Sequence, residues 1–224
     1  MRQFRLFAIT ASAALVVCGL ALAKGPGMAG GVAFTFGPDL VASDWHYMGF
    51  PWRAGAAFKA SSADAVTVET KAGVGILWHA VPLEVSGARK ARWRWRVTQG
   101  VGPTDLTKKG GDDRPLALYF AFADEDVPVM GDLTELLKRG QGHLLIYVWG
   151  GTEKPGTVLP LPYFDGRGRT VVKRPADTRA GIWFNEAVDV RGDFRRAFGR
   201  APGRLVAVAV STDATTPAVR MSPQ

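Results

Sequence analysis

Alternation of apolar and polar residues is the strongest pattern in this chain. Its clearest example is the run ARWRWRV at 91–97, where a period of two places Trp93, Trp95 and Val97 on one face. This pattern predicts a β-strand whose tryptophans face a core. The arginines of the run then face water or carboxylates on a neighbouring strand. Other alternating runs predict strands at 32–36, 65–70, 76–81, 169–173 and 182–190.

Three runs are apolar almost throughout and predict strands buried on both faces, at 116–122, 143–149 and 204–212. Residues 44–58 are rich in aromatics but have no clean period. Pro51 and Gly55 interrupt them, so we expect an irregular segment with one or two short extended pieces.

Two short helices are predicted. The first covers 132–139, with Asp132 as its N-cap and Gly140 after its end. The second lies within 192–199, with Asp193 as its cap and Gly199 as its stop. No long helix separates the strands, which argues against a parallel α/β fold. The expected fold is all-β: an antiparallel β-sandwich, jelly-roll-like, with two short helices and a single domain over 32–224.

The first 23 residues have the three parts of a secretory signal peptide. Arg2 and Arg5 precede an apolar run at 6–22, and an A-x-A motif ends at Ala23. A retained membrane anchor is the less favoured alternative, because the run is short for a membrane span. We expect cleavage after Ala23, a flexible lead-in at 24–31 and export to the periplasm or beyond, with no membrane span left in the mature protein.

Charge narrows the range of partners. The chain has 28 basic and 20 acidic residues, a net charge of +8. Loss of Arg2 and Arg5 with the signal peptide would leave 26 − 20 = +6, and loss of Cys18 would leave no cysteine for a disulfide. The basic residues are scattered rather than gathered in one dense stripe, so nucleic acid is not expected as a partner.

Five motifs in one order resemble a bacterial family of proteins, the domain-of-unknown-function family 3047. They are WRWRV, DDR before an apolar strand, YVWG, DFRRAFG and VAVAVSTD. The resemblance runs from about Trp45 to the C-terminus and implies a secreted or periplasmic β-rich domain without an assigned activity. Two features depart from that pattern: Asp213 has no second acidic residue soon after it, and a last apolar strand is missing, which we expect to leave a sheet edge unpaired.

Asp112, Asp113 and Arg114 are the leading candidates for a binding site, because they stand where an exposed loop enters a buried strand. They could anchor a ligand hydroxyl or a hard cation. The alternative is structural: an ion pair of either aspartate with an arginine of the 91–97 strand. The three histidines lack metal-ligand spacing, and no serine-nucleophile or phosphate-loop motif is present, so neither a metal nor a cofactor is predicted.

Aromatic residues at strand ends could stack on sugar rings while charged groups bind the hydroxyls. The leading hypothesis is therefore a non-catalytic module for a carbohydrate or another small ligand. The predicted ligand-binding residues are Trp78, Asp112, Asp113, Arg114, Tyr119, Tyr147, Trp149 and Trp183.

Two alternatives remain open at this point. One is a glycan-active hydrolase or lyase that uses Asp112 or Asp113 with Glu186 or Asp189 across a groove of the sandwich. The other is a structural or protein-interaction domain of the cell envelope.

Overall fold

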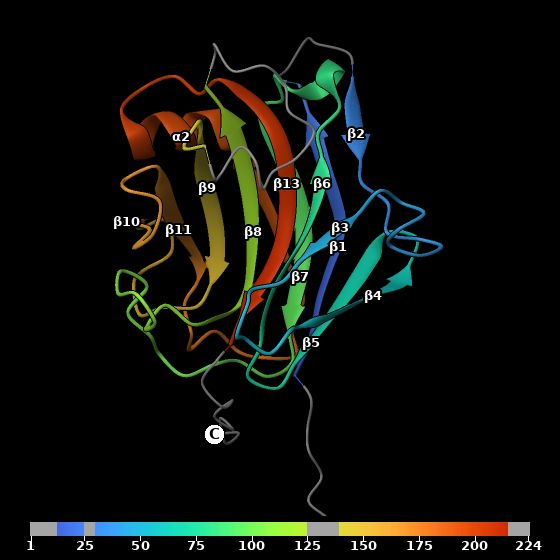
Figure 1. Cartoon of the computed structure of the whole chain (residues 1–224), viewed down its shortest axis with the longest axis vertical. Coiled ribbons are helices and arrows are strands. Elements are labelled where there is room, and N and C mark those ends of the chain that lie inside the picture. The colour runs from blue at the N-terminus through green and yellow to red at the C-terminus, as the bar shows by residue number, and fades with distance from the viewer. Residues whose placement is uncertain (1–12, 25–29, 125–138, 215–224) are drawn as a thin grey trace, which may run out of the picture.

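The computed structural model describes residues 13–24, 30–124 and 139–214. These residues form two packed β-sheets and one α-helix (Figure 1), which confirms the predicted all-β sandwich. The predicted helix at 132–139 falls almost wholly outside the described residues. The segment after 214, where a last strand is expected to be missing, also lies outside them.

The six-stranded sheet has the order β12 (Phe184–Asp189), β7 (Lys90–Val97), β1 (Ala13–Ala23), β5 (Ala65–Thr70) and β4 (Ala57–Ser62). A short strand, β2 (Gly31–Ala33), pairs with the end of β1. All of these pairings are antiparallel.

The seven-stranded sheet has the order β10 (Val158–Pro160), β11 (Gly168–Arg174), β9 (Gly142–Trp149), β8 (Arg114–Ala123), β13 (Arg204–Asp213), β6 (Val74–Ala80) and β3 (His46–Met48). It is antiparallel except between β9 and β11, which run parallel. A 3-10 turn, η1 (Leu83–Val85), connects β6 towards β7.

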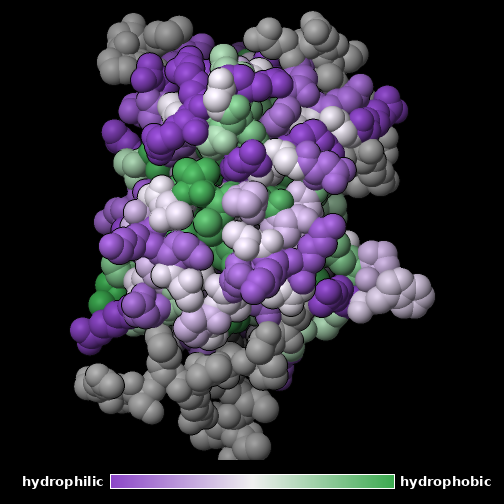
Figure 2. All heavy atoms as spheres, turned by 90° about the vertical axis from the view of Figure 1, so that its left-hand side faces the viewer, coloured by the Kyte–Doolittle hydropathy of each residue, from purple (hydrophilic) through white to green (hydrophobic). Residues whose placement is uncertain are grey.

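The main core lies between the two sheets, as the alternation predicts. Trp93 and Trp95 of β7 point inward, and Trp95 packs edge-on against Trp149 of β9 with ring centroids 5.9 Å apart. Every residue of β8 is buried, which confirms the strand predicted to be covered on both faces. The side of the sandwich where β10 and β11 lie is mostly hydrophilic, with apolar residues gathered in its middle (Figure 2).

Residues 13–23, nearly half of the predicted signal peptide, form the strand β1 between β5 and β7 (Figure 1). The side chains of Leu15, Val17, Leu20 and Leu22 are at most 1% exposed and belong to the main core. Alternation of this kind suits a buried strand as well as an export signal. Cleavage after Ala23 stays a prediction, and it would remove the strand that joins β5 to β7.

Helix α2 (Val190–Phe198) confirms the second predicted helix but corrects its start. The N-cap is Asp189, whose side chain accepts a hydrogen bond from the backbone N–H of Gly192 at 2.9 Å. The helix therefore begins directly at the end of β12. Gly199 ends it in the left-handed conformation, as expected. Among the helices that are described, none is long and apolar enough to cross a membrane.

Candidate functional site

A cavity of about 540 Å³ opens on the outer face of the seven-stranded sheet. Its floor consists of outward-facing residues of β6, β8 and β13, among them Ile76, Tyr119 and Ser211. Two loops complete it, one after β3 and one after β10. The side chains that line it from the end of β3 and from these loops are Met48, Phe50, Pro51, Arg53, Leu161, Tyr163 and Phe164.

A second apolar cluster lies on the same outer face of the sheet. Alternation turns Ala117, Ala121, Ala207 and Ala209 outward, where they belong to this cluster with Tyr119. The cavity itself is lined by other members of the cluster, Ile76, Tyr119, Leu144 and Leu161.

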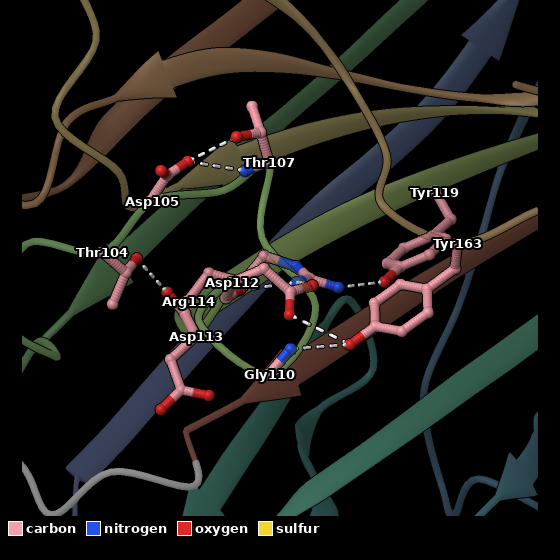
Figure 3. Close-up of polar contacts among 9 residues, drawn as sticks. All are labelled: Thr104, Asp105, Thr107, Gly110, Asp112, Asp113, Arg114, Tyr119 and Tyr163. Atoms are coloured by element: carbon pink, nitrogen blue, oxygen red, sulfur yellow. Dashed lines mark hydrogen bonds and ion pairs between the residues drawn. The ribbon is translucent and has the colours of Figure 1, made fainter.

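One end of the cavity is polar, and Arg114 is its centre (Figure 3). Its Nη1 donates to the Asp112 carboxylate at 3.0 Å and to the Asp112 carbonyl at 2.8 Å. Its Nη2 donates to the Tyr119 hydroxyl at 2.6 Å. The Nε of Arg114 is buried and has no hydrogen-bond partner within the described residues. Asp112 and Tyr119 therefore fix the guanidinium of Arg114 at the edge of the cavity that this residue lines.

Tyr163 joins this network from the loop after β10. Its hydroxyl donates to the other Asp112 oxygen at 3.2 Å and accepts from the backbone N–H of Gly110 at 3.1 Å (Figure 3). The ring is 38% exposed. Tyr163 is thus at once a wall of the cavity and a fixed partner of Asp112.

Burial shifts the titration of several groups at this end. Burial disfavours the charge of Arg114, but Tyr119, Asp112 and Asp213 outweigh it, so the pKa of the guanidinium is raised. Burial also raises the pKa of Tyr163, with Asp112 adding to the effect. The pKa of Asp213 is raised too, chiefly by burial and further by Asp112, although Arg114 opposes the shift. Asp213 consequently keeps its proton more readily than an ordinary aspartate does.

Asp112 and Asp113 do not converge. The carboxylate of Asp113 points away from Asp112 and from both tyrosines (Figure 3). Its backbone carbonyl accepts a hydrogen bond from the Thr104 hydroxyl at 2.6 Å, which fixes the loop where it enters β8. The structural alternative is corrected for Asp112, because its partner is Arg114 and not an arginine of β7.

Only part of the predicted set of ligand residues meets at this cavity. Arg114 and Tyr119 line it, and Asp112 supports them. Trp78 lies on the same face of the sheet, stacked on His46 with ring centroids 4.6 Å apart, but it does not line the cavity.

Tyr147, Trp149 and Trp183 are elsewhere. Tyr147 and Trp149 point into the main core, where both are at most 1% exposed. Trp183 is next to Arg94 and Arg96 of the other sheet. The run 143–149 is apolar on both faces, so no polar residue marks which of its side chains point inward.

The two carboxylates expected to oppose Asp112 are engaged elsewhere. Glu186, on β12 of the other sheet, accepts from Trp95 Nε1 at 3.1 Å and from Arg174 Nε at 2.8 Å. Asp189 caps α2 and pairs with Arg89 at 2.7 Å. Both carboxylates therefore have structural roles. The described part of the chain holds no cluster of three or more histidine, cysteine or acidic side chains that could bind a metal.

The residues that reasoning from the sequence missed come mainly from loops. Tyr163 belongs to PYFDG, whose aromatic pair between turn residues is the one available signal. Asp213 stands at the end of β13 and pairs directly with Arg114, just where the register of the two strands shifts. That pairing depends on strand order, which the sequence does not reveal.

Comparison with protein families gives one match: the model of a family described as "Protein of unknown function (DUF3047)" matches residues 43–220. This range includes the cavity and all but the first strands of the sandwich. Comparison with curated proteins and with solved structures gives no match.

Proposed function

The chain belongs to the DUF3047 family of proteins of unknown function, and from that premise we propose that it binds a small amphipathic ligand in the cavity of the seven-stranded sheet. The observation that carries the proposal is the division of this cavity into an apolar wall and a hydrogen-bonding end. Its volume of about 540 Å³ falls within the usual range for small-molecule sites.

The wall suits an apolar body. Met48, Phe50, Pro51, Leu144 and Leu161 all line the cavity, and Phe50 is 41% exposed. Exposed apolar side chains that gather in a hollow gain free energy when a ligand removes them from water. No tryptophan lines the cavity, so the broad flat platform on which sugars usually stack is supplied only in part, by Phe50 and Tyr163.

The polar end suits an uncharged head group that carries hydroxyls. Carboxyl groups and guanidiniums are mixed at this end, where Asp112 pairs with Arg114 and where Asp213 and Arg53 line the cavity. The Arg53 guanidinium, which lines the cavity, offers donors, and the carboxylate oxygens of Asp213 offer acceptors. An alkyl glycoside has this combination of an apolar chain and a hydroxylated head.

A glycan-active hydrolase or lyase is the second candidate. The observation in its favour is Asp213, a carboxyl group of the cavity that burial keeps protonated more readily. Asp213 would then be the second carboxyl group of such an enzyme and would act as its acid. The sequence had suggested Glu186 or Asp189 as that second carboxyl group. The predicted signal peptide would place either activity in the periplasm or outside the cell.

Titration calorimetry with octyl glucoside, below the concentration at which it forms micelles, tests the proposal. We expect saturable binding of one molecule, no detectable binding of glucose, and weaker binding of octanoate, whose carboxylate would meet Asp112 and Asp213. Absence of saturable binding, or a preference for octanoate, contradicts the proposal. Release of glucose from the glycoside would instead support the hydrolase.

A further inference from the structure

The outer face of the six-stranded sheet carries a row of arginines. Arg92, Arg94 and Arg96 alternate along β7 and point away from the core, while Trp93 and Trp95 point into it. Residues two apart on a strand are about 6.8 Å apart. The arginine row, defined as these three residues, is therefore a straight line of evenly spaced positive charges on a sheet.

The strands beside the arginine row do not neutralise it. The residues directly opposite on β1 are Ala21, Cys18 and Val16. Those on β12 are Ala187 and Asn185. None of the five is acidic. Of the two predicted surroundings for these arginines, water or carboxylates of a neighbouring strand, the directly paired positions supply no carboxylate, and Arg92 and Arg94 are exposed. Like charges held in a line without counter-charges favour an anionic partner.

Trp183 holds two of the guanidiniums in place. The guanidinium carbons of Arg94 and Arg96 lie 4.8 and 4.9 Å from the centroid of its ring. The Nε of Arg94 also donates to the sulfur of Cys18 at 2.8 Å. Ordering side chains before binding lowers the entropy lost when a ligand binds. Two of the three arginines, Arg94 and Arg96, are thus preorganised rather than freely moving surface charges.

One donor in the row is unused. The Nε of Arg96 is buried and has no hydrogen-bond partner in the part of the chain that is described. The nearest acidic influence on Arg94 is Asp64, which already accepts a hydrogen bond from the Ser62 hydroxyl at 2.6 Å. Forked guanidinium donors match the geometry of a carboxylate, which can accept two of their hydrogen bonds at once.

We propose that the arginine row binds a linear carboxylated polysaccharide. A chain of uronic acid residues presents carboxylates at regular intervals and can lie along a flat sheet. Nucleic acid fits less well, because single strands need exposed aromatic rings for their bases and Trp183 already carries two guanidiniums. A membrane surface fits less well, because the paired residues beside the row are small or polar and include no large apolar side chain to insert.

This site is independent of the cavity, which lies on the other sheet. The test uses the full chain and a fluorescently labelled oligogalacturonate at low salt, with dextran of similar length as the neutral control. We expect binding to the oligogalacturonate that weakens steeply as salt is added, and no binding to dextran. Changing Arg92, Arg94 and Arg96 together to glutamine should weaken binding at least tenfold.

A matched variant separates the row from general charge. Changing Lys108, Lys109 and Lys154 to glutamine removes the same charge from exposed loops and should alter affinity less than twofold. Changing all three arginines of the row to lysine keeps the charge but removes the forked guanidinium donors. This variant should bind severalfold more weakly while the protein keeps its melting temperature. Equal losses in the arginine and loop-lysine glutamine variants would overturn the proposal. Equal or tighter binding to single-stranded DNA or to phosphatidylglycerol vesicles would also overturn it, in favour of those partners.

Discussion

Arg114 and Asp112 form a buried ion pair in which Nη1 of the guanidinium lies 3.0 Å from the carboxylate. Their side chains are only 8% and 3% exposed. The pair joins the loop before β8 to the first residue of that strand, and Tyr119 and Tyr163 attach to it from either side. The polar end of the cavity depends on this pair for its shape.

A double-mutant cycle on this pair should show strong coupling. Arg114→Met leaves the Asp112 carboxylate buried without its counter-charge, and we expect the free energy of unfolding to fall by about 3–5 kcal/mol. Asp112→Asn removes the counter-charge of the guanidinium but leaves it near Asp213 and bonded to the Tyr119 hydroxyl, so we expect a smaller loss. The double variant should lose clearly less than the sum of the single losses. Urea unfolding measures all four proteins, and additive losses would show that the two side chains do not depend on each other.

Tyr147 should prove structural rather than ligand-binding. Its hydroxyl donates to the Asp193 carboxylate at 2.6 Å, on the core side of the sheet. Tyr147→Phe removes one hydrogen bond and should lower the free energy of unfolding by about 1 kcal/mol. Affinity for octyl glucoside, measured by calorimetry, should stay within twofold. A large loss of affinity without a loss of stability would contradict this and would show that Tyr147 takes part in ligand binding.

The pKa of Asp213 makes a prediction about pH. Burial raises this pKa in the folded state, so the folded protein takes up a proton more readily than the unfolded chain. For an acid shifted in this direction, stability falls as the pH rises from the unfolded value through the folded one. Asp213→Asn should therefore stabilise the protein at pH 7, and the gain should vanish below the ordinary pKa of an aspartate, about 3.8. Urea midpoints at both pH values check this, and a variant less stable at pH 7 would contradict it.

We expect the stability of the folded protein to depend strongly on residues 13–23, which form β1. Four of its side chains are buried in the main core, and each such burial is worth about 1.5–3 kcal/mol. Their sum rivals the whole stability of an ordinary domain, about 5–15 kcal/mol. We expect a chain of residues 24–224 to melt far below the full chain, or not to fold. Calorimetry of both chains tests this, together with mass spectrometry of the exported protein to find its first residue. Equal melting temperatures would show that the sandwich does not need β1.

Local patterns determined much of the fold in advance. The alternation in WRWRV correctly predicted that Trp93 and Trp95 face the core, because a period of two allows only one division into faces. The strand β1 was not predicted, because an apolar run suits an export signal and a buried strand equally well. Asp189 and Asp193 are both acceptable helix caps, and the sequence alone does not rank them.

The candidate site could likewise be predicted from the sequence only in part. Asp112, Arg114 and Tyr119 are close along the chain, so their meeting could be predicted from one loop and one strand. Tyr163 and Asp213 reach the cavity only because β8 lies between β9 and β13, an order set by long-range pairing. For the arginine row, alternation predicted that the side chains point outward. It did not predict the neutral residues that are paired with them on the neighbouring strands.

The most direct test of the central claim compares two neighbouring aromatic residues. Phe50 lines the cavity, whereas Trp52, two positions along, is fully exposed and does not line it. Phe50→Ala should weaken the binding of octyl glucoside at least fivefold in titration calorimetry, because it removes apolar area from the wall. Trp52→Ala should leave the affinity unchanged, and both variants should keep the melting temperature. Equal affinities in the two variants would contradict the assignment of this cavity as the ligand site.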